Sequence, residues 1–254
     1  KTGRPMSSII PKGAKWIKDR AKGFDADKNT VHTEKSGDIT YDYLVVAPGL
    51  AYDFSLVPGL GEAMDKGVVC SNYTDPKHTW DVVKNFKGGT ALFTQPATPI
   101  KCGGAPQKIM YLAESHWAKS NTKSNTKVIF ATAGTVIFGT KEIAKTLMEV
   151  VDRKDINLRF NHKLVEVDGA NKIAWYELTK DIEAGGCVVM SGDDVNKHLD
   201  EKFQYNYKDV KVTVKDGRYG IHYDMLHTAP PSVAPKFVKE SNLVNDAGWL
   251  DVDH

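Results

Sequence analysis

The sequence predicts an α/β fold, with a helix-flanked parallel sheet in the middle of the chain and antiparallel hairpins on both sides. Between residues 88 and 161, short apolar runs alternate with amphipathic helical patterns, as is typical of parallel strands joined by helices. The flanking stretches alternate polar and apolar residues and turn at pairs such as Asp-Gly, which indicates hairpins. A nine-residue phrase also occurs twice, as YDYLVVAPG from Tyr41 and YDMLHTAPP from Tyr223, so we expect two related domains.

The N-terminal part predicts a β-meander that ends in a buried strand. A short strand in residues 15–24, a turn at 25–27 and a second strand at 29–32 come first. Residues 39–47, ITYDYLVVA, form a short apolar run that is rich in Tyr and Val and is stopped by Pro48 and Gly49. Such a run predicts a strand that is buried on both faces of a sheet.

The middle of the chain predicts a strand–helix–strand–helix–strand order, which is a Rossmann-like βαβ domain. The strands are expected at 88–96, 127–134 and 156–161, and the helices at 105–120 and 141–154. The first helix carries its apolar face on Ile109, Met110, Ala113 and Trp117. The second is expected to be capped by Thr140 and to bury Ile143, Leu147, Val150 and Val151.

The C-terminal part predicts antiparallel hairpins in residues 162–178 and 209–229. The polar segment 180–207 between them is interpreted as an inserted loop, in which Cys187 is incidental. Because the repeated phrase closes two sheets, it predicts two related domains of the nucleotide-binding type. We therefore expect a partial first domain at 1–56, a second domain at 57–232 and a return segment at 233–254.

Composition excludes several classes of protein. The chain of 254 residues has a net charge of +2 without a block of like charge, which argues against a nucleic-acid partner. Its three cysteines do not form a disulfide scaffold and fit a reducing compartment. The sequence has no run of about 18 apolar residues, no signal-peptide pattern and no initial Met, so we expect an internal piece of a longer protein.

One cysteine stands in an unusual place. In TPIKCGGAPQKIM, Cys102 follows Lys101 and directly precedes the predicted helix 105–120. A helix N-terminus has unpaired N–H groups and a positive dipole end, which favour the thiolate that acts as the nucleophile of a cysteine. Lys108 adds positive charge early in the helix, and the Gly103–Gly104 pair lets the backbone approach a bound group closely. The pattern indicates a reactive thiol.

The other candidate residues are interpreted as structural. Cys70 stands in the apolar stretch GVVCSNYT and is expected to be a packing residue. The eight histidines show no paired ligand spacing, and no Cys-x-x-Cys pair occurs, so no metal site is predicted. Residues 134–142, GTVIFGTKE, lack the order of a phosphate loop and are expected to be a strand followed by a helix cap.

Five stretches carry a resemblance to a known family: WIKDRAKGFDADKNTVHT, YDYLVVAPG, FTQPATPIKCGGAPQKIMYLAE, YDMLHTAPP and AGWLDVD. Together they resemble the sulfide:quinone oxidoreductases of the mitochondrial type, within the class of flavoproteins that have two dinucleotide-type domains. The resemblance covers nearly the whole chain except 180–207, and it implies that residues 1–56 are the back part of an FAD domain. Pro48 departs from the Thr of many members. The opening glycine motif, the late Gly-Asp segment, the second redox cysteine and the C-terminal membrane helices are absent, so the resemblance implies the central portion of the enzyme.

The resemblance also implies a chemistry for the whole enzyme. Cys102 matches one member of a redox cysteine pair and would carry a persulfide, with Lys108 as an electrostatic helper. Ala21, Ala47, Pro48 and Gly49 match positions that lie beside FAD. The implied partners are hydrogen sulfide, ubiquinone and a small sulfur acceptor, at the mitochondrial inner membrane through segments that are absent here.

Two other functions compete with this one. The first is a protein similar to type II NADH dehydrogenases, which the sequence FTQPATPIKCGG disfavours because it lacks a glycine-rich phosphate loop. The second is a flavin-free, non-catalytic fragment that binds a partner or a persulfide. The absence of both ends of the expected FAD site adds weight to the second alternative.

Overall fold

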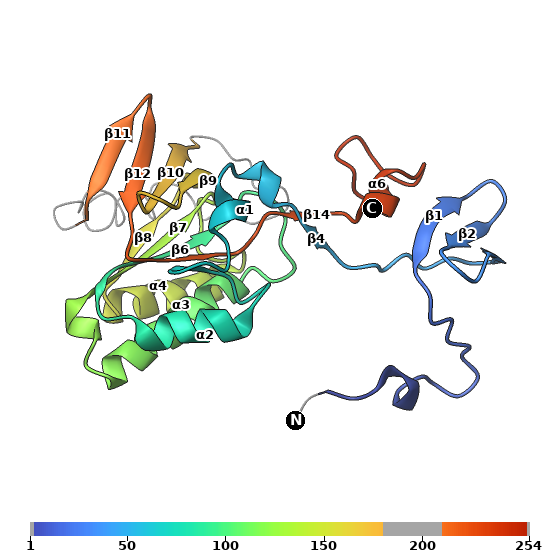
Figure 1. Ribbon diagram of the computed structural model, residues 1–254, viewed down its shortest axis with the longest axis horizontal. Coiled ribbons are helices and arrows are strands. Elements are labelled where there is room, and N and C mark those ends of the chain that lie inside the picture. Colours follow the sequence, from blue (N-terminus) through green and yellow to red (C-terminus); the bar gives the residue numbers. More distant parts are fainter. Residues whose placement is uncertain (1–2, 180–209, 253–254) are drawn as a thin grey trace. The chain divides into compact units, whose positions relative to one another are not determined.

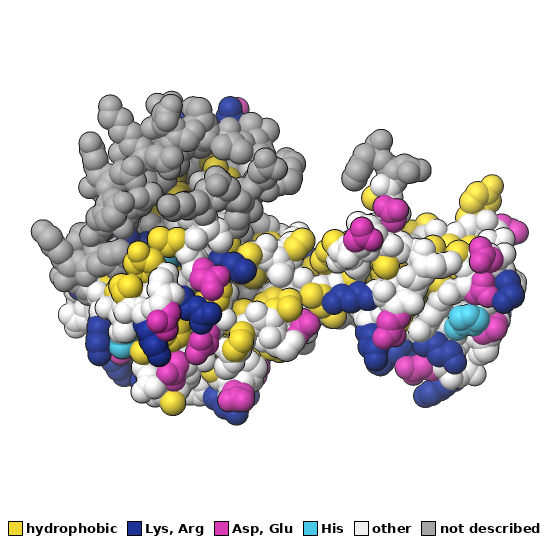
Figure 2. Space-filling model, turned by 90° about the horizontal axis from the view of Figure 1, so that it is seen from above, with side chains coloured by type: hydrophobic (Ala, Val, Ile, Leu, Met, Phe, Trp, Pro, Cys, Tyr) yellow, Lys and Arg dark blue, Asp and Glu magenta, His cyan; other side chains and the backbone are white. Residues whose placement is uncertain are grey.

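The computed structural model describes residues 3–179 and 210–252, so the predicted insertion 180–207 and Cys187 lie outside the described residues. The chain forms two compact units, which we describe separately (Figure 1). Unit 1 comprises residues 1–51 and 234–254, and unit 2 comprises residues 52–233. In both units Lys and Arg side chains are interspersed with Asp and Glu on the face shown in Figure 2. None of the helices in the described ranges has both the length and the apolar character that a bilayer crossing needs.

Unit 1 is built around an antiparallel β-meander. Its elements are the 3₁₀ turn η1 (Met6–Ser8), the strands β1 (Ala21–Asp25), β2 (Thr30–Thr33) and β3 (Asp38–Thr40), and the short helix α6 (Lys236–Lys239). The sheet order is β1-β2-β3, with both pairs antiparallel. The meander that the sequence predicts over residues 15–40 is therefore present.

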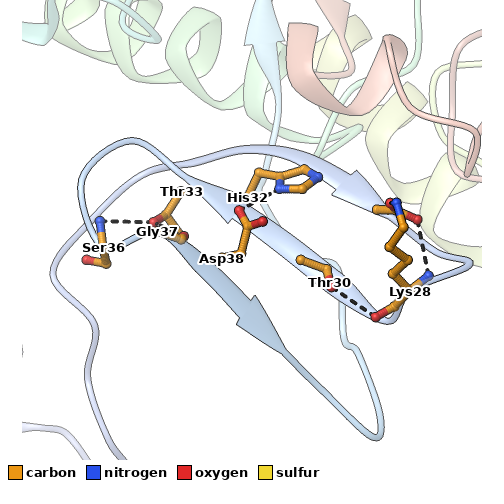
Figure 3. Close-up of polar contacts among 8 residues, drawn as sticks. Lys28, Thr30, His32, Thr33, Ser36, Gly37 and Asp38 are labelled. Carbon is orange, nitrogen blue, oxygen red and sulfur yellow. Dashed lines mark hydrogen bonds and ion pairs between the residues drawn. The ribbon is translucent and has the colours of Figure 1, made fainter.

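Side chains hold the β2–β3 turn in shape (Figure 3). The Thr33 hydroxyl donates to the Gly37 carbonyl at 2.7 Å and accepts from the Ser36 N–H at 3.1 Å. Across the two strands, His32 Nδ1 lies 2.7 Å from an Asp38 carboxylate oxygen. These local contacts stabilise a tight turn between short strands that bury little apolar surface.

The predicted buried strand at 39–47 is wrong for this structure. β3 ends at Thr40, and residues 41–50 form no strand. The side chains of Tyr43 and Val45 are 95% and 89% exposed. A strand buried on both faces needs paired strands at both edges, and no strand among the described residues of unit 1 pairs with residues 42–50.

Unit 2 contains a five-stranded parallel sheet of order β5-β13-β6-β7-β8. All four neighbouring pairs are parallel. Three of the strands are those expected from the apolar runs between 88 and 161. The strand bounds are Val69–Cys70 for β5, Gly89–Gln95 for β6, Thr126–Thr132 for β7, Ile156–Arg159 for β8 and Met225–Thr228 for β13. The late strand β13 inserts between two strands from the first half of the unit.

Helices cover one face of this sheet and an antiparallel sheet covers the other (Figure 1). The helices are α2 (Pro76–Asn85), α3 (Ala105–Lys119) and α4 (Lys141–Arg153). The antiparallel sheet has the order β11-β12-β10-β9 and corresponds to the predicted hairpins. Its strands are β9 (His162–Asp168), β10 (Ile173–Leu178), β11 (Val212–Lys215) and β12 (Arg218–His222). The mixed α/β fold with a Rossmann-like sheet is thus confirmed.

Shorter elements complete unit 2. They are β4 (Ala51–Tyr52), η2 (Phe54–Leu56), α1 (Leu60–Ala63), η3 (Lys123–Asn125) and β14 (Ser232–Val233). β4 and β14 pair as a two-stranded ribbon where the chain enters and leaves the unit. This ribbon brings the two ends of unit 2 together, and the Asp53 N–H donates to the Pro231 carbonyl at 2.9 Å.

The parallel sheet separates two hydrophobic cores. On the helix side, Phe93 and Phe130 pack with Trp117 of α3 in one cluster of buried side chains. On the opposite side, Leu92 and Ile129 belong to a second cluster with the antiparallel sheet. Adjacent strand residues point to opposite faces, so a strand that is apolar throughout supplies both cores.

The helices α3 and α4 occur where the sequence predicts them, with two corrections in α4. Thr140 is the residue before α4, but its side chain makes no capping hydrogen bond. Of the expected apolar face, Val151 is buried and Leu147 packs against the helix-side core, whereas Ile143 is 46% exposed and the unpredicted Ala144 is buried. The strand expected within 134–142 is also wrong, because these residues form bends before the helix begins at Lys141.

Candidate functional site

The candidate site lies in unit 2, beyond the carboxyl ends of the parallel strands, where ligands commonly bind in α/β sheets. Cys102 stands in the loop that connects β6 to α3. Tyr73 stands in the loop that connects β5 to α2. The strand β13 lies between β5 and β6, so its carboxyl end, with His227 and Thr228, comes between these two loops.

Cys102 occupies the expected position before a helix N-terminus. α3 begins at Ala105 after Gly104, and the Ala105 N–H donates to the Cys102 carbonyl at 3.1 Å. The Cys102 side chain is exposed and free of any disulfide. A thiol here is accessible to a small reactant and faces the positive end of a 15-residue helix.

The Cys102 sulfur, the Lys108 side chain and the Phe138 ring all lie near Gly104. A Cβ atom at Gly104 would lie 4.0 Å from Cys102 Sγ, 3.7 Å from Lys108 Cε and 3.8 Å from Phe138 Cε2. The thiol and the Lys108 side chain, predicted together from the sequence, are therefore neighbours in the structure. The Phe138 ring, which the sequence did not single out, supplies an apolar wall.

A buried glutamine joins the Cys102 loop to the loop that carries Phe138. Gln107 is 2% exposed, and its Nε2 donates to the Ile137 carbonyl at 2.5 Å. The same nitrogen lies 3.5 Å from the Gly103 carbonyl, and the Tyr111 hydroxyl lies 3.5 Å from Gln107 Oε1. Because Gln107 contacts both loops, it fixes Phe138 beside the thiol. In the sequence, this contact between the two loops is indicated by the position of Gln107 in the first turn of the predicted helix 105–120.

Tyr73 presents a buried hydroxyl that has no hydrogen-bond partner in the described part of the chain. Its ring packs edge-on against the ring of Tyr52, with centroids 6.1 Å apart. Burial, together with smaller contributions from negative charge on Cys102 and Tyr52, raises the pKa of Tyr73 to about 12. The Tyr73 hydroxyl therefore keeps its proton at neutral pH and remains a donor.

A buried histidine anchors the residue next to Tyr73. The backbone N–H of Asn72 lies 3.2 Å from His227 Nε2, and Asn72 Oδ1 lies 2.8 Å from the same nitrogen. His227 is 0% exposed, and its ring lies 5.7 Å from the Phe93 ring. Burial lowers the pKa of His227 to about 3, so the imidazole is neutral near pH 7. The sequence analysis missed this pair.

The four expected flavin-contacting residues belong to unit 1. Ala47, Pro48 and Gly49 are consecutive exposed residues after the meander. Gly49 has a φ of +81°, and no atom lies within 4 Å of the position that a Cβ would occupy. Ala21 is half-buried at the start of β1. The segment 47–49 thus presents an open backbone along which a nucleotide could lie.

The remaining candidates have structural roles. Cys70 is fully buried in the helix-side core, and burial raises the pKa of its thiol to about 12, which disfavours a nucleophile. Within residues 3–179 and 210–252, no cluster of three or more His, Cys, Asp or Glu side chains could hold a metal ion. Two surface cavities of about 630 and 380 Å³ in unit 2 have linings that do not include Cys102.

Comparisons with known proteins identify what the chain is similar to. No protein-family model matches it. The mitochondrial sulfide:quinone oxidoreductase of Mus musculus is 34% identical over 252 residues, which are 98% of this chain and 49% of the mouse protein. The Dictyostelium discoideum protein of the same name is 32% identical over 249 residues, covering 96% of this chain and 47% of that protein.

Solved structures agree on the fold. The sulfide:quinone oxidoreductase of Aquifex aeolicus matches with a TM-score of 0.62 at 16% identity, over 91% of this chain and 46% of that chain. The NDH2 of Plasmodium falciparum matches with a TM-score of 0.54 at 12% identity, over 89% of this chain and 42% of that chain. At these identities the matches show the fold alone. By sequence, the chain is related over nearly all of its residues to the mitochondrial sulfide:quinone oxidoreductases, and it spans about half of their length.

Proposed function

We propose that the protein to which this chain corresponds is a flavin-dependent enzyme that oxidises hydrogen sulfide at Cys102 and passes two electrons through FAD to ubiquinone. The observation that carries the proposal is the exposed thiol at the N-terminus of α3, in a chain that is 34% identical to a sulfide:quinone oxidoreductase over 98% of its length. Because the chain spans about half of its relatives, the activity is assigned to the longer protein and not to this portion alone.

The proposed chemistry begins with a sulfur–sulfur bond between Cys102 and a second cysteine of the longer protein. Hydrosulfide attacks the Cys102 sulfur, a new S–S bond forms, and the second cysteine leaves as a thiolate with the electron pair of the broken bond. Cys102 then carries a persulfide, which keeps the proton of the hydrosulfide. Transfer of the outer sulfur to a small nucleophilic acceptor returns Cys102 to the thiolate.

Residues around Cys102 suit these negatively charged steps. The positive end of the α3 dipole and the neighbouring Lys108 ammonium stabilise an anionic sulfur. The Phe138 ring and the small residue Gly104 leave a compact, partly apolar space beside the thiol. Lys108 is therefore assigned an electrostatic role, and Cys102 the covalent one.

The residues of unit 1 fit the flavin nucleotide. The exposed backbone of Ala47, Pro48 and Gly49, with no atom near the missing Cβ of Gly49, leaves room for a nucleotide beside the main chain. The small side chain of Ala21 leaves similar room at β1. When bound, FAD supplies the acceptor for the two electrons that are released as the two thiolates return to a disulfide.

The proposal extends to the setting of the longer protein. The relatives are named as mitochondrial proteins, so we place this one in mitochondria, associated with the inner membrane through segments other than those described here. The sequence division into a partial FAD domain at 1–56, a second domain at 57–232 and a return segment at 233–254 is retained as part of the proposal.

The alternative of a type II NADH dehydrogenase-like protein is less well supported. The relatives that match by sequence at 34% and 32% identity are named sulfide:quinone oxidoreductases. The β6–α3 loop holds Pro96, Pro99 and Cys102 where a dinucleotide loop would hold glycines. A flavin-free binding fragment remains a distinct hypothesis, and flavin absorbance separates it from the enzyme.

Substitution of the thiol tests the proposal directly. In a protein of the relatives' full length, Cys102→Ser is expected to lower sulfide-to-ubiquinone turnover by at least about 10³-fold, because a hydroxyl forms neither the S–S bond nor the persulfide. Turnover is measured as ubiquinone reduction, and the bound flavin is measured by its visible absorbance.

The matched control is Cys70→Ala, which removes a buried thiol of the helix-side core. This variant is expected to retain turnover within about threefold at a temperature where it is folded. Full activity of Cys102→Ser would overturn the assignment of the nucleophile. A full-length protein that binds no FAD would overturn the flavoenzyme proposal itself.

A further inference from the structure

Cys102 lies in a loop that needs contacts to hold it in place. Residues 96–104 connect β6 to α3 and form only bends and turns. Such a segment keeps a defined shape only where hydrogen bonds or packing bind it to the rest of the fold. The position of a nucleophilic sulfur matters for its rate, because a misplacement of about 1 Å can cost about 10²-fold. Residues that bind this loop are therefore candidates for a positioning role.

A hydrogen bond at Thr98 joins the loop to the strand β14. Thr98 Oγ1 accepts the backbone N–H of Ser232 at 3.0 Å. Ser232 is 3% exposed and begins β14, so its N–H needs an acceptor inside the protein. A few residues earlier, the Ala229 N–H donates to the Thr94 carbonyl at 3.1 Å. The two segments thus run side by side, and the Thr98 hydroxyl extends the pairing of β13 with β6 past the end of β6.

The neighbours of Thr98 in the sequence carry the effect of this contact toward Cys102. Pro96 and Pro99 stand on either side of it, and the ring of each proline fixes its φ. A residue directly before a proline is also restricted to extended conformations, which applies to Thr98 itself. A hydrogen bond at Thr98 therefore sets both the position and the direction of the chain. It shortens the unsupported stretch before the cysteine from residues 96–101 to residues 99–101.

After Cys102, the loop is held by the first turn of α3. The Ala105 N–H donates to the Cys102 carbonyl at 3.1 Å. Cys102 Sγ lies 4.0 Å, and Lys108 Cε 3.7 Å, from the position that a Cβ on Gly104 would occupy. The place of the sulfur beside this positive charge depends on the conformation of the loop, which is bound at Thr98 on one side and at α3 on the other.

We propose that Thr98 is a positioning residue for Cys102. By accepting the Ser232 N–H, it holds the loop between β6 and α3 in the conformation that places the sulfur at the start of α3, beside Lys108. The inference deepens the proposed function and rests on it for the sulfur chemistry of Cys102. Thr98 acts through the backbone of the loop and takes no part in the chemistry itself. The role needs a hydroxyl oxygen, which Ser retains and which Val and Ala lack.

The test compares two alkylating reagents on this chain, with no flavin, sulfide or quinone required. Iodoacetamide is neutral and iodoacetate is an anion, so the ratio of their rate constants reports the positive charge around the sulfur, and the thiolate fraction cancels. Labelling is measured by mass spectrometry on the tryptic peptide that begins at Cys102, so that the other cysteines do not contribute.

Thr98→Val is expected to lower the iodoacetate-to-iodoacetamide ratio by about threefold. This is the effect on an anion of losing one unit charge about 7 Å away in water, and Lys108→Gln is expected to have a similar one. Salt at about 1 M is expected to abolish the difference between the natural chain and the variant. Thr98→Ala removes the same acceptor and is expected to act like Thr98→Val, whereas Thr98→Ser is expected to keep the natural ratio.

A matched control separates this role from a general loss of stability. Thr126→Val removes a hydroxyl that donates to the Thr122 carbonyl at 2.8 Å, at the start of β7 and thus at the opposite edge of the sheet. A variant that only destabilises unit 2 exposes the thiol to both reagents alike, so Thr126→Val is expected to leave the ratio unchanged.

Hydrogen exchange of the Ser232 amide measures the contact itself. The amide is expected to be protected in the natural chain and in Thr98→Ser, and to exchange about tenfold faster in Thr98→Val.

Three results would overturn the inference: an unprotected Ser232 amide in the natural chain, an unchanged reagent ratio in both Thr98→Val and Thr98→Ala, or an equal fall of the ratio in Thr126→Val. None of them would bear on whether Cys102 carries the persulfide, because that assignment is tested by turnover of Cys102→Ser in the full-length protein. Conversely, an active Cys102→Ser enzyme would remove the proposed function while leaving the measured effect of Thr98 on the loop in place.

Discussion

Residues 41–49 and 223–231 carry nearly the same phrase, YDYLVVAPG and YDMLHTAPP, in two different surroundings. In unit 2 the second phrase forms β13, which pairs in parallel with β5 on one edge and β6 on the other. All of β13 is buried. In unit 1 the first phrase forms no strand, and Tyr43 and Val45 are almost fully exposed.

The comparison shows what the phrase requires in order to become a strand. A strand that begins Tyr-Asp-x-Leu is suited to burial on both faces, but it supplies only one side of each hydrogen-bonded ladder. β13 obtains both neighbours from its own unit. Residues 41–49 lack them among the described residues of unit 1, so apolar side chains that suit a core remain exposed. The two related phrases therefore have different structures because their neighbours differ.

The largest expected difference between the two phrases concerns their equivalent leucines. Leu226 is 0% exposed and packs in the core beneath the antiparallel sheet, whereas Leu44 is only half-buried. Leu226→Ala is expected to lower the free energy of unfolding of unit 2 by about 2–5 kcal/mol, because it removes buried methyl groups and leaves a cavity. Leu44→Ala is expected to cost less than about 1 kcal/mol. Urea unfolding followed by Trp fluorescence measures both, and equal losses would contradict the comparison.

The second prediction uses the histidine that replaces the valine of the first phrase. His227 stands where the first phrase has Val45, and burial lowers its pKa to about 3. The unfolded chain, with a histidine pKa near 6.5, then binds more protons than the folded chain between about pH 3 and 6.5. The stability contributed by neutral His227 is complete above about pH 6.5 and is lost as the pH falls through that window.

His227→Val is expected to remove about 2 kcal/mol of the acid destabilisation that the natural chain shows between pH 7 and pH 5. The urea midpoint at each pH measures this difference. His162, whose pKa is lowered to about 4 by burial, remains in both proteins, so its contribution to the slope cancels in the comparison. An identical pH dependence in the variant would show that His227 is protonated or solvated in the folded chain.

Much of unit 2 follows from local sequence patterns. The helix α3 was predictable because Met110, Ala113 and Trp117 recur at helical spacing, and all three are buried. The strands β6 and β7 were predictable as short apolar runs. The helix α2 was missed, because only Thr79 and Val83 are buried in it. Its start signal, Asp75 followed by Pro76, was present, and the Asp75 carboxylate caps the N–H groups of Lys77 and His78.

The candidate site also has one part that local sequence predicts and one part that it does not. The place of Cys102 before a helix follows from the adjacent Gly-Gly-Ala-Pro sequence, which is local information. The contact between Asn72 and His227 joins residues 155 positions apart, and it exists because β13 inserts between β5 and β6. No periodicity or motif within either segment specifies that insertion. Asn72 therefore could not be placed beside His227 from the sequence alone.

The smallest expected difference concerns the two aspartates of the repeated phrase. The Asp224 carboxylate accepts the Thr90 N–H at 2.8 Å, where β6 begins. A Cβ on Gly89, whose φ is +102°, would collide with this carboxylate, so the glycine makes room for the contact. Asp224→Ala is expected to lower the free energy of unfolding of unit 2 by about 1 kcal/mol, since the contact is exposed to solvent. Asp42→Ala is expected to have no measurable effect in this chain.

In a protein of the relatives' full length, comparing Asp42 with Asp224 tests whether the first phrase forms a strand there. If the first phrase there pairs with two parallel strands as β13 does, Asp42 is expected to accept a backbone N–H at the start of one of them. Asp42→Ala should then cost about as much as Asp224→Ala does, about 1 kcal/mol, and the amides of residues 43–46 should become protected from hydrogen exchange. Protection without a cost for Asp42→Ala would mean that the strand forms but that the aspartate contact is specific to unit 2. Unprotected amides in the longer protein would mean that the two phrases share a sequence without sharing a structure.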